Sequence, residues 1–236
     1  MTPATIYGFS PAFGLPTSGP FALKLLCWCA LNGVPYEFAV ENNPAKGPLK
    51  KSPWAVIDGE TVADSDAIIA LLARRHGIPP PVADTAPAAA GRGWKMAAEE
   101  GLHQIFEWEL IMLPEGSAWF RELLRSEMSA PLAALVHRMS RRSLGRQLHA
   151  RGLVRLGPEK IAARGRDLLD ALDLWLGVHD FVEGPAPGIA DATMYGMLAP
   201  MLGWPMDTPV ARHAKTLPAI GAWSDTIARR CGFAPG

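Results

Sequence analysis

The stretch of sequence that decides the fold is KSPWAVIDGETVADSDAII, residues 51–69. Pro53 stands before a short apolar run, and Asp58-Gly59 is a dipeptide typical of a two-residue β-hairpin turn. A second short strand follows at 60–63, and the sequence then changes to a helical pattern. The stretch therefore predicts a β-hairpin followed at once by a helix.

The ends of these elements could bind a ligand. Asp64 and Ser65 open the helix, where the helix dipole and the free N–H groups favour a carboxylate. Proline lacks the N–H that a strand donates, so Pro53 leaves the backbone of Ser52 free to pair with something extended. These residues predict a site for a small peptide-like anion or, alternatively, a hairpin and a capped helix without a ligand.

Composition limits the class of protein. The length of 236 residues is sufficient for two domains, and a hydrophobic content of 49% is sufficient to form buried cores. The 23 basic and 23 acidic residues leave no formal net charge, so no overall field favours nucleic acid or anionic lipid as a partner. No apolar run reaches the roughly 18 residues of a membrane span, and no signal-peptide pattern opens the chain. We therefore expect a cytoplasmic protein with no membrane span and no nucleic-acid partner.

The cysteines and histidines do not indicate a metal. Cys27, Cys29 and Cys231 are an odd number without zinc spacing, which favours free thiols in a reducing compartment. Two positions apart on a helix, Cys27 and Cys29 point about 200° away from each other, so one ion cannot bind both. The six histidines show no two-ligand spacing supported by a neighbouring acid. We expect buried thiols and no metal site.

The order of elements changes near residue 80. Before it, the patterns predict strands at 5–9 and 36–40, a strand that Pro53 enters and that ends at the Asp58-Gly59 turn, a further strand at 60–63, and helices at 21–31 and 64–76. After it, they predict helices at about 91–113, 115–148, 158–179, 189–203 and 216–230, with a break inside the second. We therefore expect an α/β domain at 1–78, a linker rich in proline and alanine at 79–90, and an all-helical domain at 91–236.

Asp191, three residues after Gly188, is typical of a capping box rather than of catalysis.

The stretch that contains Pro53 resembles the thioredoxin-like domain of the glutathione transferase superfamily. The pattern of that family is a cis-proline before the third strand and a Glu/Gln/Asp-Ser pair before the third helix. The resemblance implies that Pro53 is cis, that Ser52, beside Lys51, offers its backbone to the cysteinyl part of glutathione, and that Asp64 and Ser65 hold the γ-glutamyl end. It also implies the glutathione transferase fold, a thioredoxin-like N-terminal domain followed by an all-α C-terminal domain.

Other segments extend the resemblance over most of the chain. Pro20-Phe21-Ala22-Leu23-Lys24-Leu25 resembles the first helix of the family, and residues 147–199, with Ala190-Asp191-Ala192-Thr193, resemble the C-terminal domain of the metaxin and failed-axon-connections branch. Metaxins are membrane-attached, but no anchor is visible in this sequence. The resemblance also implies a homodimer.

The sequence departs from the family at the reactive position. Relatives often begin the first helix with Ser-Pro-Phe-Cys or Cys-Pro-Tyr-Cys, because a hydroxyl or thiol at a helix N-terminus stabilises or becomes the reactive sulfur. Aligned on Pro20-Phe21, these positions hold Gly19 and Ala22. A dithiol mechanism therefore does not fit this sequence.

Three hydroxyl groups remain candidates for stabilising a glutathione thiolate. Ser18 is the first, because a small change of register in the preceding loop brings it to the sulfur, and Thr17 is the second. Tyr7 is the third, since some transferases use a tyrosine at the end of the first strand. Lowering the thiol pKa by about two units, roughly 2.7 kcal/mol, makes thiolate dominate at neutral pH. The alternative is that the loop hydroxyls only cap the helix.

A second substrate would lie against the helical domain. An apolar pocket could be lined by His103, Phe106, Glu107 and Trp108, with Trp119 and Phe120, although aromatic residues at helical spacing are also typical of a core. The arginines of 138–155 indicate a solvated helix face and connecting loop, or alternatively a patch that binds an anion or nucleic acid. The sequence thus predicts an enzyme that binds glutathione and conjugates or reduces a hydrophobic electrophile. The alternative is an inactive binding or scaffold protein with the same fold.

Overall fold

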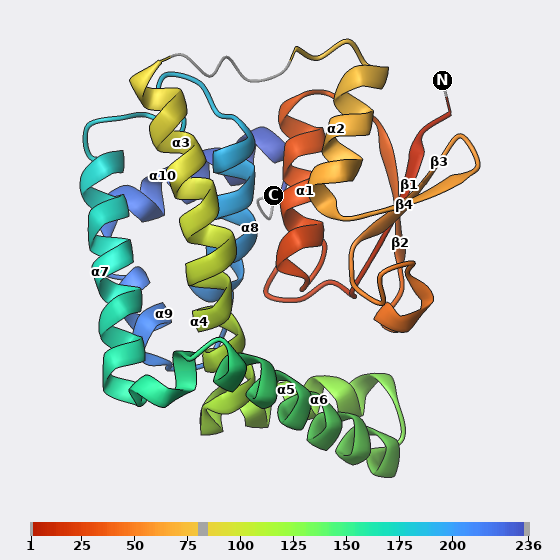
Figure 1. Cartoon of the computed structure of the whole chain (residues 1–236), viewed down its shortest axis with the longest axis vertical. Helices are drawn as coiled ribbons and strands as arrows, with labels where there is room; N and C mark the ends of the chain where they lie inside the picture. Colours follow the sequence, from red (N-terminus) through yellow and green to blue (C-terminus); the bar gives the residue numbers. More distant parts are fainter. Residues whose placement is uncertain (1, 80–84, 234–236) are drawn as a thin grey trace.

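A four-stranded sheet forms the centre of the first part of the chain (Figure 1). The structure is a computed structural model that describes residues 2–79 and 85–233. The elements of this part are β1 (Ala4–Gly8), α1 (Pro20–Leu31), β2 (Tyr36–Val40), β3 (Trp54–Ile57), β4 (Glu60–Ala63) and α2 (Ser65–Arg75), with one 3₁₀ turn, η1 (Pro44–Lys46). The strand order is β2-β1-β3-β4, with β1 parallel to β2 and antiparallel to β3. The expected thioredoxin-like arrangement is confirmed.

The predicted hairpin joins β3 to β4. Asp58 and Gly59 have φ values of 51° and 86°, so both turn residues are in the left-handed region that a type I′ turn requires. Trp54 pairs with Ala63 at the other end of the hairpin. The peptide bond before Pro53 is cis, as the family resemblance implied. The register therefore puts Pro53 and the start of α2 at the same end of the hairpin.

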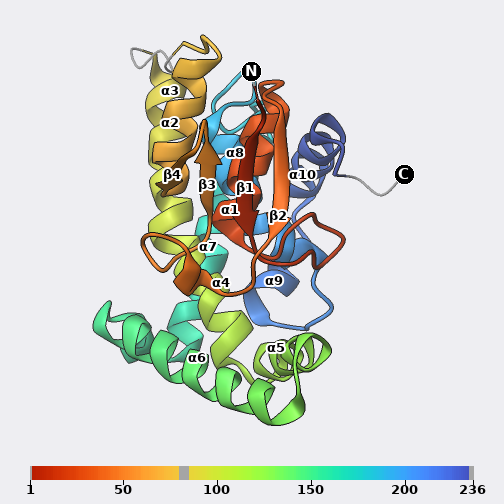
Figure 2. The same ribbon diagram turned by 90° about the vertical axis from the view of Figure 1, so that its right-hand side faces the viewer.

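The second part of the chain is helical. Its helices are α3 (Ala86–Met96), α4 (His103–Glu107), α5 (Pro114–Glu127), α6 (Ala130–Ala150), α7 (Pro158–Leu176), α8 (Ile189–Gly203), α9 (Pro209–Ala214) and α10 (Pro218–Cys231). The π-helical segment η2 (Ala97–Leu102) joins α3 and α4 into one rod, which a second π-helical segment, η3 (Trp108–Met112), continues after α4. A short 3₁₀ helix, η4 (Leu153–Leu156), precedes α7. The helices α5 and α6 lie together at one end of the molecule (Figures 1 and 2).

The structure corrects the predicted linker. We expected 79–90 to hold no helix, but α3 begins at Ala86, and residues 80–84 lie outside the described part of the chain. The Thr85 hydroxyl accepts a hydrogen bond from the N–H of Ala88 at 3.3 Å, and Pro87 falls in the first turn, where proline is tolerated. Alanine is the best helix former, so a cap followed by alanines outweighs the proline.

The other boundaries follow the prediction closely, with two additions. The break inside 115–148 falls between α5 and α6, and α9 is a short helix that the patterns did not predict. The start of α9 is held by a buried carboxylate, because Glu109 accepts hydrogen bonds from the Val210 N–H at 2.6 Å and the Thr208 hydroxyl at 2.8 Å. No helix among residues 2–79 and 85–233 is long and apolar enough to cross a membrane.

Asp191 has the structural role that its capping-box position predicts. Its buried carboxylate accepts hydrogen bonds from the N–H groups of Val182 at 2.8 Å and Gly188 at 3.0 Å, and from the Trp223 indole at 2.8 Å. These bonds tie the start of α8 to the preceding loop and to α10. Every partner is a structural donor, so the carboxylate is committed to the fold.

The two parts of the chain meet where α1 crosses α8. Gly196 lies at this crossing, and a Cβ there would be 2.5 Å from the carbonyl oxygen of Pro20 and 2.8 Å from the backbone nitrogen of Lys24. Such distances are shorter than van der Waals contact, so only glycine permits this approach of the two helices. Figure 1 shows α1 between α2 on one side and α8 on the other.

A buried ion-pair network spans the same junction. The Lys24 side chain is 0% exposed, and its ammonium group contacts Asp66 of α2 and, at 2.6 Å, Glu99 of η2. Lys95 of α3 bridges the same two acids, at 2.6 and 2.9 Å. Partial burial acts to raise the pKa of Asp66, but hydrogen bonds from Lys24 and Lys95 outweigh it and hold that pKa below its usual value. Two cations and two anions therefore link the sheet domain to the helical domain.

Removing the buried cation should destabilise the protein. We expect Lys24→Met to lower the free energy of unfolding by roughly 2–3 kcal/mol, because it leaves two partly buried acids with one cation. The matched control is Lys46→Met, whose side chain is 63% exposed and pairs with Glu41. That change should cost less than about 1 kcal/mol. Urea denaturation measures both, and equal effects in the two variants would contradict a structural role for the network.

Candidate functional site

A cavity of about 440 Å³ lies between the two parts of the chain. One wall consists of the loop after β1, the start of α1 and the segment before β3, and the other wall consists of side chains from α4 to α6. The volume is typical of a small-molecule site. Most of the helical wall is apolar; its lining side chains include Phe106, Leu110, Ile111, Trp119, Phe120 and Leu144. The cavity therefore combines a polar backbone wall with a wall suited to a hydrophobic molecule.

Ser18 lines this cavity at the N-terminus of α1. Its N–H donates to the Ser10 carbonyl oxygen at 2.8 Å, which fixes the loop at this point. Gly19 is the N-cap of α1 and makes no side-chain cap, while Ala22 is 1% exposed and adds no reactive group. The helix N-terminus is thus open toward the cavity, with Ser18 as the adjacent hydroxyl.

Thr17 and Tyr7 are not among the cavity-lining residues. Thr17 is 0% exposed, and its hydroxyl donates to the Phe9 carbonyl oxygen at 2.8 Å and accepts from the Gly19 N–H at 3.2 Å. Tyr7 lies on β1, with its ring stacked on Trp54 at a centroid distance of 5.3 Å. Of the three predicted hydroxyls, the structure brings only Ser18 to the cavity. The Thr17 hydroxyl instead holds the loop against α1.

Lys51 and Ser52 line the cavity directly before cis-Pro53. The Ser52 hydroxyl oxygen is buried and has no hydrogen-bond partner among the described residues. A buried polar atom without a partner is costly unless a ligand or a water supplies one. This observation is consistent with a polar ligand at the segment where the cysteinyl part of glutathione was expected.

Asp64 and Ser65 lie at the N-terminus of α2, beyond the lining of the cavity. Asp64 has φ 75° and ψ 125°, a strained backbone conformation for a residue other than glycine. Its carboxylate accepts the N–H groups of Asp66 and Ala67 at 3.0 Å each. Ser65 is 4% exposed, and its hydroxyl accepts a hydrogen bond from Lys24 at 3.3 Å. Both side chains therefore have structural partners, and the buried Lys24 places positive charge behind this helix end.

His103 and Phe106 line the helical wall, as their spacing suggested, but Trp108 does not. Trp108 is 4% exposed and belongs to the hydrophobic core, because it falls on the opposite side of the helix from the cavity wall. The His103 ring packs edge-on against Phe21 of α1, with 4.8 Å between centroids. Burial, with smaller contributions from Arg151 and Lys51, lowers the pKa of His103 to about 4. This imidazole is therefore neutral at physiological pH.

Glu107 follows one turn after His103 and also lines the cavity. Burial raises its pKa, against the opposing effects of Arg151 and Lys51. The sequence predicted Glu107 among the pocket-lining residues but assigned it no role, although an acid four residues after a histidine, among aromatic residues, could have indicated one. Arg151, from the arginine-rich segment, thus borders this site.

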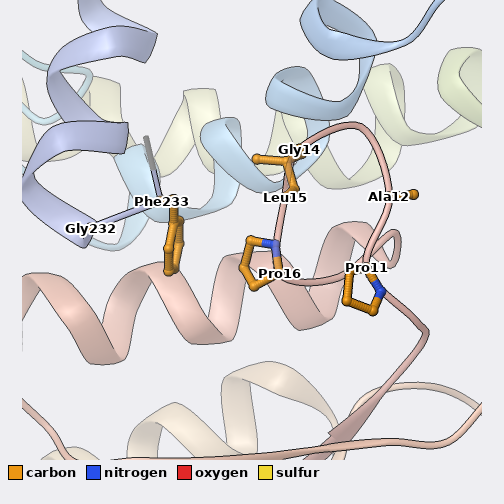
Figure 3. A pocket seen from close by; sticks show the side chains of 7 residues that line it. All are labelled: Pro11, Ala12, Gly14, Leu15, Pro16, Gly232 and Phe233. Carbon is orange, nitrogen blue, oxygen red and sulfur yellow. The ribbon is translucent and has the colours of Figure 1, made fainter. Parts of the chain in front are cut away.

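A second hollow lies between the loop at 11–16 and the end of α10 (Figure 3). Its described lining consists of Pro11, Ala12, Gly14, Leu15, Pro16, Gly232 and Phe233. Figure 3 shows Leu15 and Pro16 on the loop side and Phe233 opposite them. None of these seven side chains can titrate or act as a nucleophile, so this hollow offers no chemistry.

The thiols are also remote from the main cavity. Cys27 and Cys29 are buried in α1, and burial raises the pKa of Cys29 to about 12. The sulfur atoms of Cys27 and Cys231 are 3.5 Å apart, and all three cysteines are free. Within residues 2–79 and 85–233, no group of three or more histidine, cysteine, aspartate or glutamate side chains is arranged to hold a metal ion.

Comparison with known proteins agrees with this architecture. Residues 20–116 match the model of the glutathione S-transferase N-terminal domain. The isoprene-epoxide glutathione S-transferase of Rhodococcus sp. (strain AD45) is 23% identical over 245 aligned positions, which cover 96% of this chain and 98% of that protein.

Two solved structures show the same fold at low identity. The β-etherase LigF of Sphingobium sp. strain SYK-6 aligns with a TM-score of 0.63 and 17% identity over 96% of this chain and 95% of its own. Glutathione S-transferase III in its apo form aligns with a TM-score of 0.61 and 19% identity over 98% and 94%. Together with the domain match, these likenesses show that the chain has the glutathione transferase fold.

Proposed function

We propose that the protein is a glutathione-dependent transferase that conjugates or reduces a hydrophobic electrophile. The observation that carries this proposal is the cavity itself, in which the segment before cis-Pro53 and the start of α1 face an aromatic and aliphatic wall. A tripeptide thiol needs the first wall, and an apolar reaction partner needs the second. Holding both reactants in one cavity raises the rate through proximity.

Glutathione would extend from the cavity toward α2. The free backbone of Ser52 pairs with the cysteinyl part, Lys51 lies beside it, and the N-terminus of α2 receives the γ-glutamyl carboxylate through its N–H groups at Asp64 and Ser65. The hairpin register supports this path, because Trp54 pairs with Ala63 and so brings both ends of the ligand site to one edge.

Ser18 would stabilise the glutathione thiolate. A hydroxyl donor at a helix N-terminus lowers a thiol pKa, and Ser18 is the cavity-lining hydroxyl at that position. Thr17 then acts as a positioning residue for the loop, through its bonds to Phe9 and Gly19.

The competing function is a binding or scaffold protein that kept the fold and lost the chemistry. Gly19 and Ala22 favour it, because they stand where many relatives carry the reactive hydroxyl or thiol. The narrower resemblance to the metaxin branch, the homodimer and the cytoplasmic location stay predictions. Sedimentation of the purified protein would test the homodimer.

Calorimetric titration with reduced glutathione tests the proposed function first. We expect binding with release of a proton, because the cavity favours the thiolate, and weaker binding of S-methylglutathione, which cannot ionise. Cysteinylglycine should also bind more weakly, since it lacks the γ-glutamyl carboxylate that α2 would receive. If none of the three binds at millimolar concentration, the scaffold function is favoured instead.

Replacing Ser18 should separate turnover from binding. We expect Ser18→Ala to raise the pKa of bound glutathione and to lower turnover by roughly 10–100-fold while leaving glutathione affinity within about twofold. The matched control is Ser126→Ala, an exposed serine on α5, which should behave like the original protein. Ultraviolet absorbance of the thiolate against pH measures the shift, and an unchanged thiol pKa in Ser18→Ala would remove Ser18 from the mechanism.

A further inference from the structure

Glu107 is an acidic residue among mainly apolar neighbours, and no hydrogen bond holds its Oε2 atom among the described residues. Its side chain is 16% exposed, and its Oε2 atom is buried with no hydrogen-bond partner among the described residues. The neighbouring polar groups stand just beyond bonding distance, with Arg151 Nη1 3.9 Å from Oε2 and His103 Nε2 4.0 Å from Oε1. By contrast, the fully buried acids Glu109 and Asp191 are each held by several donors, and the part-buried Glu99 is paired with two lysines. Among the described residues, Glu107 is thus a largely buried acid with one carboxyl oxygen that no hydrogen bond holds.

The position of this carboxyl group faces both reactants of the proposed reaction. His103, one turn earlier on the same helix, packs against Phe21, two residues past the helix N-terminus where the thiolate would lie. Lys51, next to the segment that would bind the cysteinyl part, is close enough to act electrostatically on Glu107. On its other side Glu107 adjoins the apolar wall of the same cavity. A molecule between the thiolate and that wall would lie against the Glu107 side chain, which lines the cavity.

We propose that Glu107 is a catalytic proton donor to a leaving oxygen, and that the electrophile of this cavity is therefore a compound with an activated carbon–oxygen bond, such as an epoxide. This inference rests on the proposed glutathione-dependent function and goes beyond it by naming the bond that breaks. A halide leaves as a stable anion and needs no proton. An alkoxide is a strong base, so it leaves far more readily when an acid protonates it in the transition state.

The reaction balances with the groups present. The thiolate sulfur of glutathione forms a bond to one carbon of the epoxide, and the carbon–oxygen bond breaks with its electron pair going to oxygen. That oxygen takes the proton of the Glu107 carboxyl group and becomes a hydroxyl. The carboxylate regains a proton from solvent, where the thiol proton went when glutathione ionised. Because burial raises the pKa of Glu107, a larger share of this carboxyl group is protonated at neutral pH than for an exposed glutamate.

The groups around Glu107 affect its role as a proton donor in different ways. Neutral His103 cannot compete as the acid, since its pKa of about 4 leaves it deprotonated at neutral pH. Arg151 and Lys51 favour the carboxylate and so stabilise it after the proton has left. The titratable group that faces Glu107 from its own helix is thus neutral, and the two cations come from the residue that follows α6 and from the segment before β3.

The test compares two electrophiles in the full-length protein. Styrene oxide supplies a leaving oxygen, and 1-chloro-2,4-dinitrobenzene supplies a leaving chloride. We expect Glu107→Gln, which keeps the shape but cannot donate the proton, to lower turnover of the epoxide by about 100-fold while changing turnover of the chloride less than about threefold. Calorimetric titration with glutathione should give the same affinity as the original protein, which checks that the variant is folded.

Controls separate the failure of this inference from failure of the proposed function. Glu127→Gln removes another acid near the cavity, an exposed one that accepts a bond from Ser10, and should leave the ratio of the two rates unchanged. Glu107→Asp keeps an acid with a shorter reach and should recover part of the epoxide activity. A protein that binds glutathione and conjugates the chloride but opens no epoxide, or an equal loss for both electrophiles in Glu107→Gln, overturns the inference. Absence of glutathione binding in the original protein overturns the proposed function itself.

Discussion

The crossing of α1 and α8 is the constraint on which the rest of the structure depends. Gly196 lets the two helix backbones meet, and Lys24, one turn into α1, is buried against acids from both parts of the chain. Because α1 is held at this point, its N-terminus has a fixed position at the edge of the cavity. The loop that carries Ser18 inherits that position through the hydrogen bonds of Thr17. The geometry of a reactive sulfur would thus be set by packing and charge several residues away from it.

The cavity also separates two kinds of chemistry. On the sheet side, the polar groups are backbone atoms, small hydroxyls and the side chains of Asn42, Lys50 and Lys51, which suit a peptide. On the helical side, burial keeps His103 neutral and makes Glu107 harder to ionise. Desolvation acts in opposite directions on the two pKa values, because the charged form is the protonated one in histidine and the deprotonated one in glutamate. Both groups are consequently uncharged more often than exposed residues of the same type, which suits an apolar reaction partner.

Local signals predicted most of the fold and only part of the site. The Asp58-Gly59 turn and the capping position of Asp191 need only a few neighbouring residues, and the structure agrees with both. The predicted start of α3 was wrong. The prolines of 79–90 suggested a linker, but a capping threonine followed by a run of alanines begins this helix at Ala86. The network around Lys24 joins residues more than 70 positions apart, so no local pattern reveals it. Thr17 and Ser18 differ by one position in sequence, yet only the folded loop decides which hydroxyl faces the cavity.

The π-helical segments that flank α4 have a consequence for how such a cavity can arise. Each π turn accommodates one extra residue in a helix, and one residue corresponds to a rotation of about 100° around the axis. The segments at 97–102 and 108–112 therefore change the angular phase of the rod on both sides of His103 to Glu107. A helix packed against its neighbours along one continuous stripe has no free face for a ligand. Between the two segments, His103 and Glu107 line the cavity while Ile105 stays in the core, so insertions the size of a single codon are sufficient to change which side chains of a helix face a ligand.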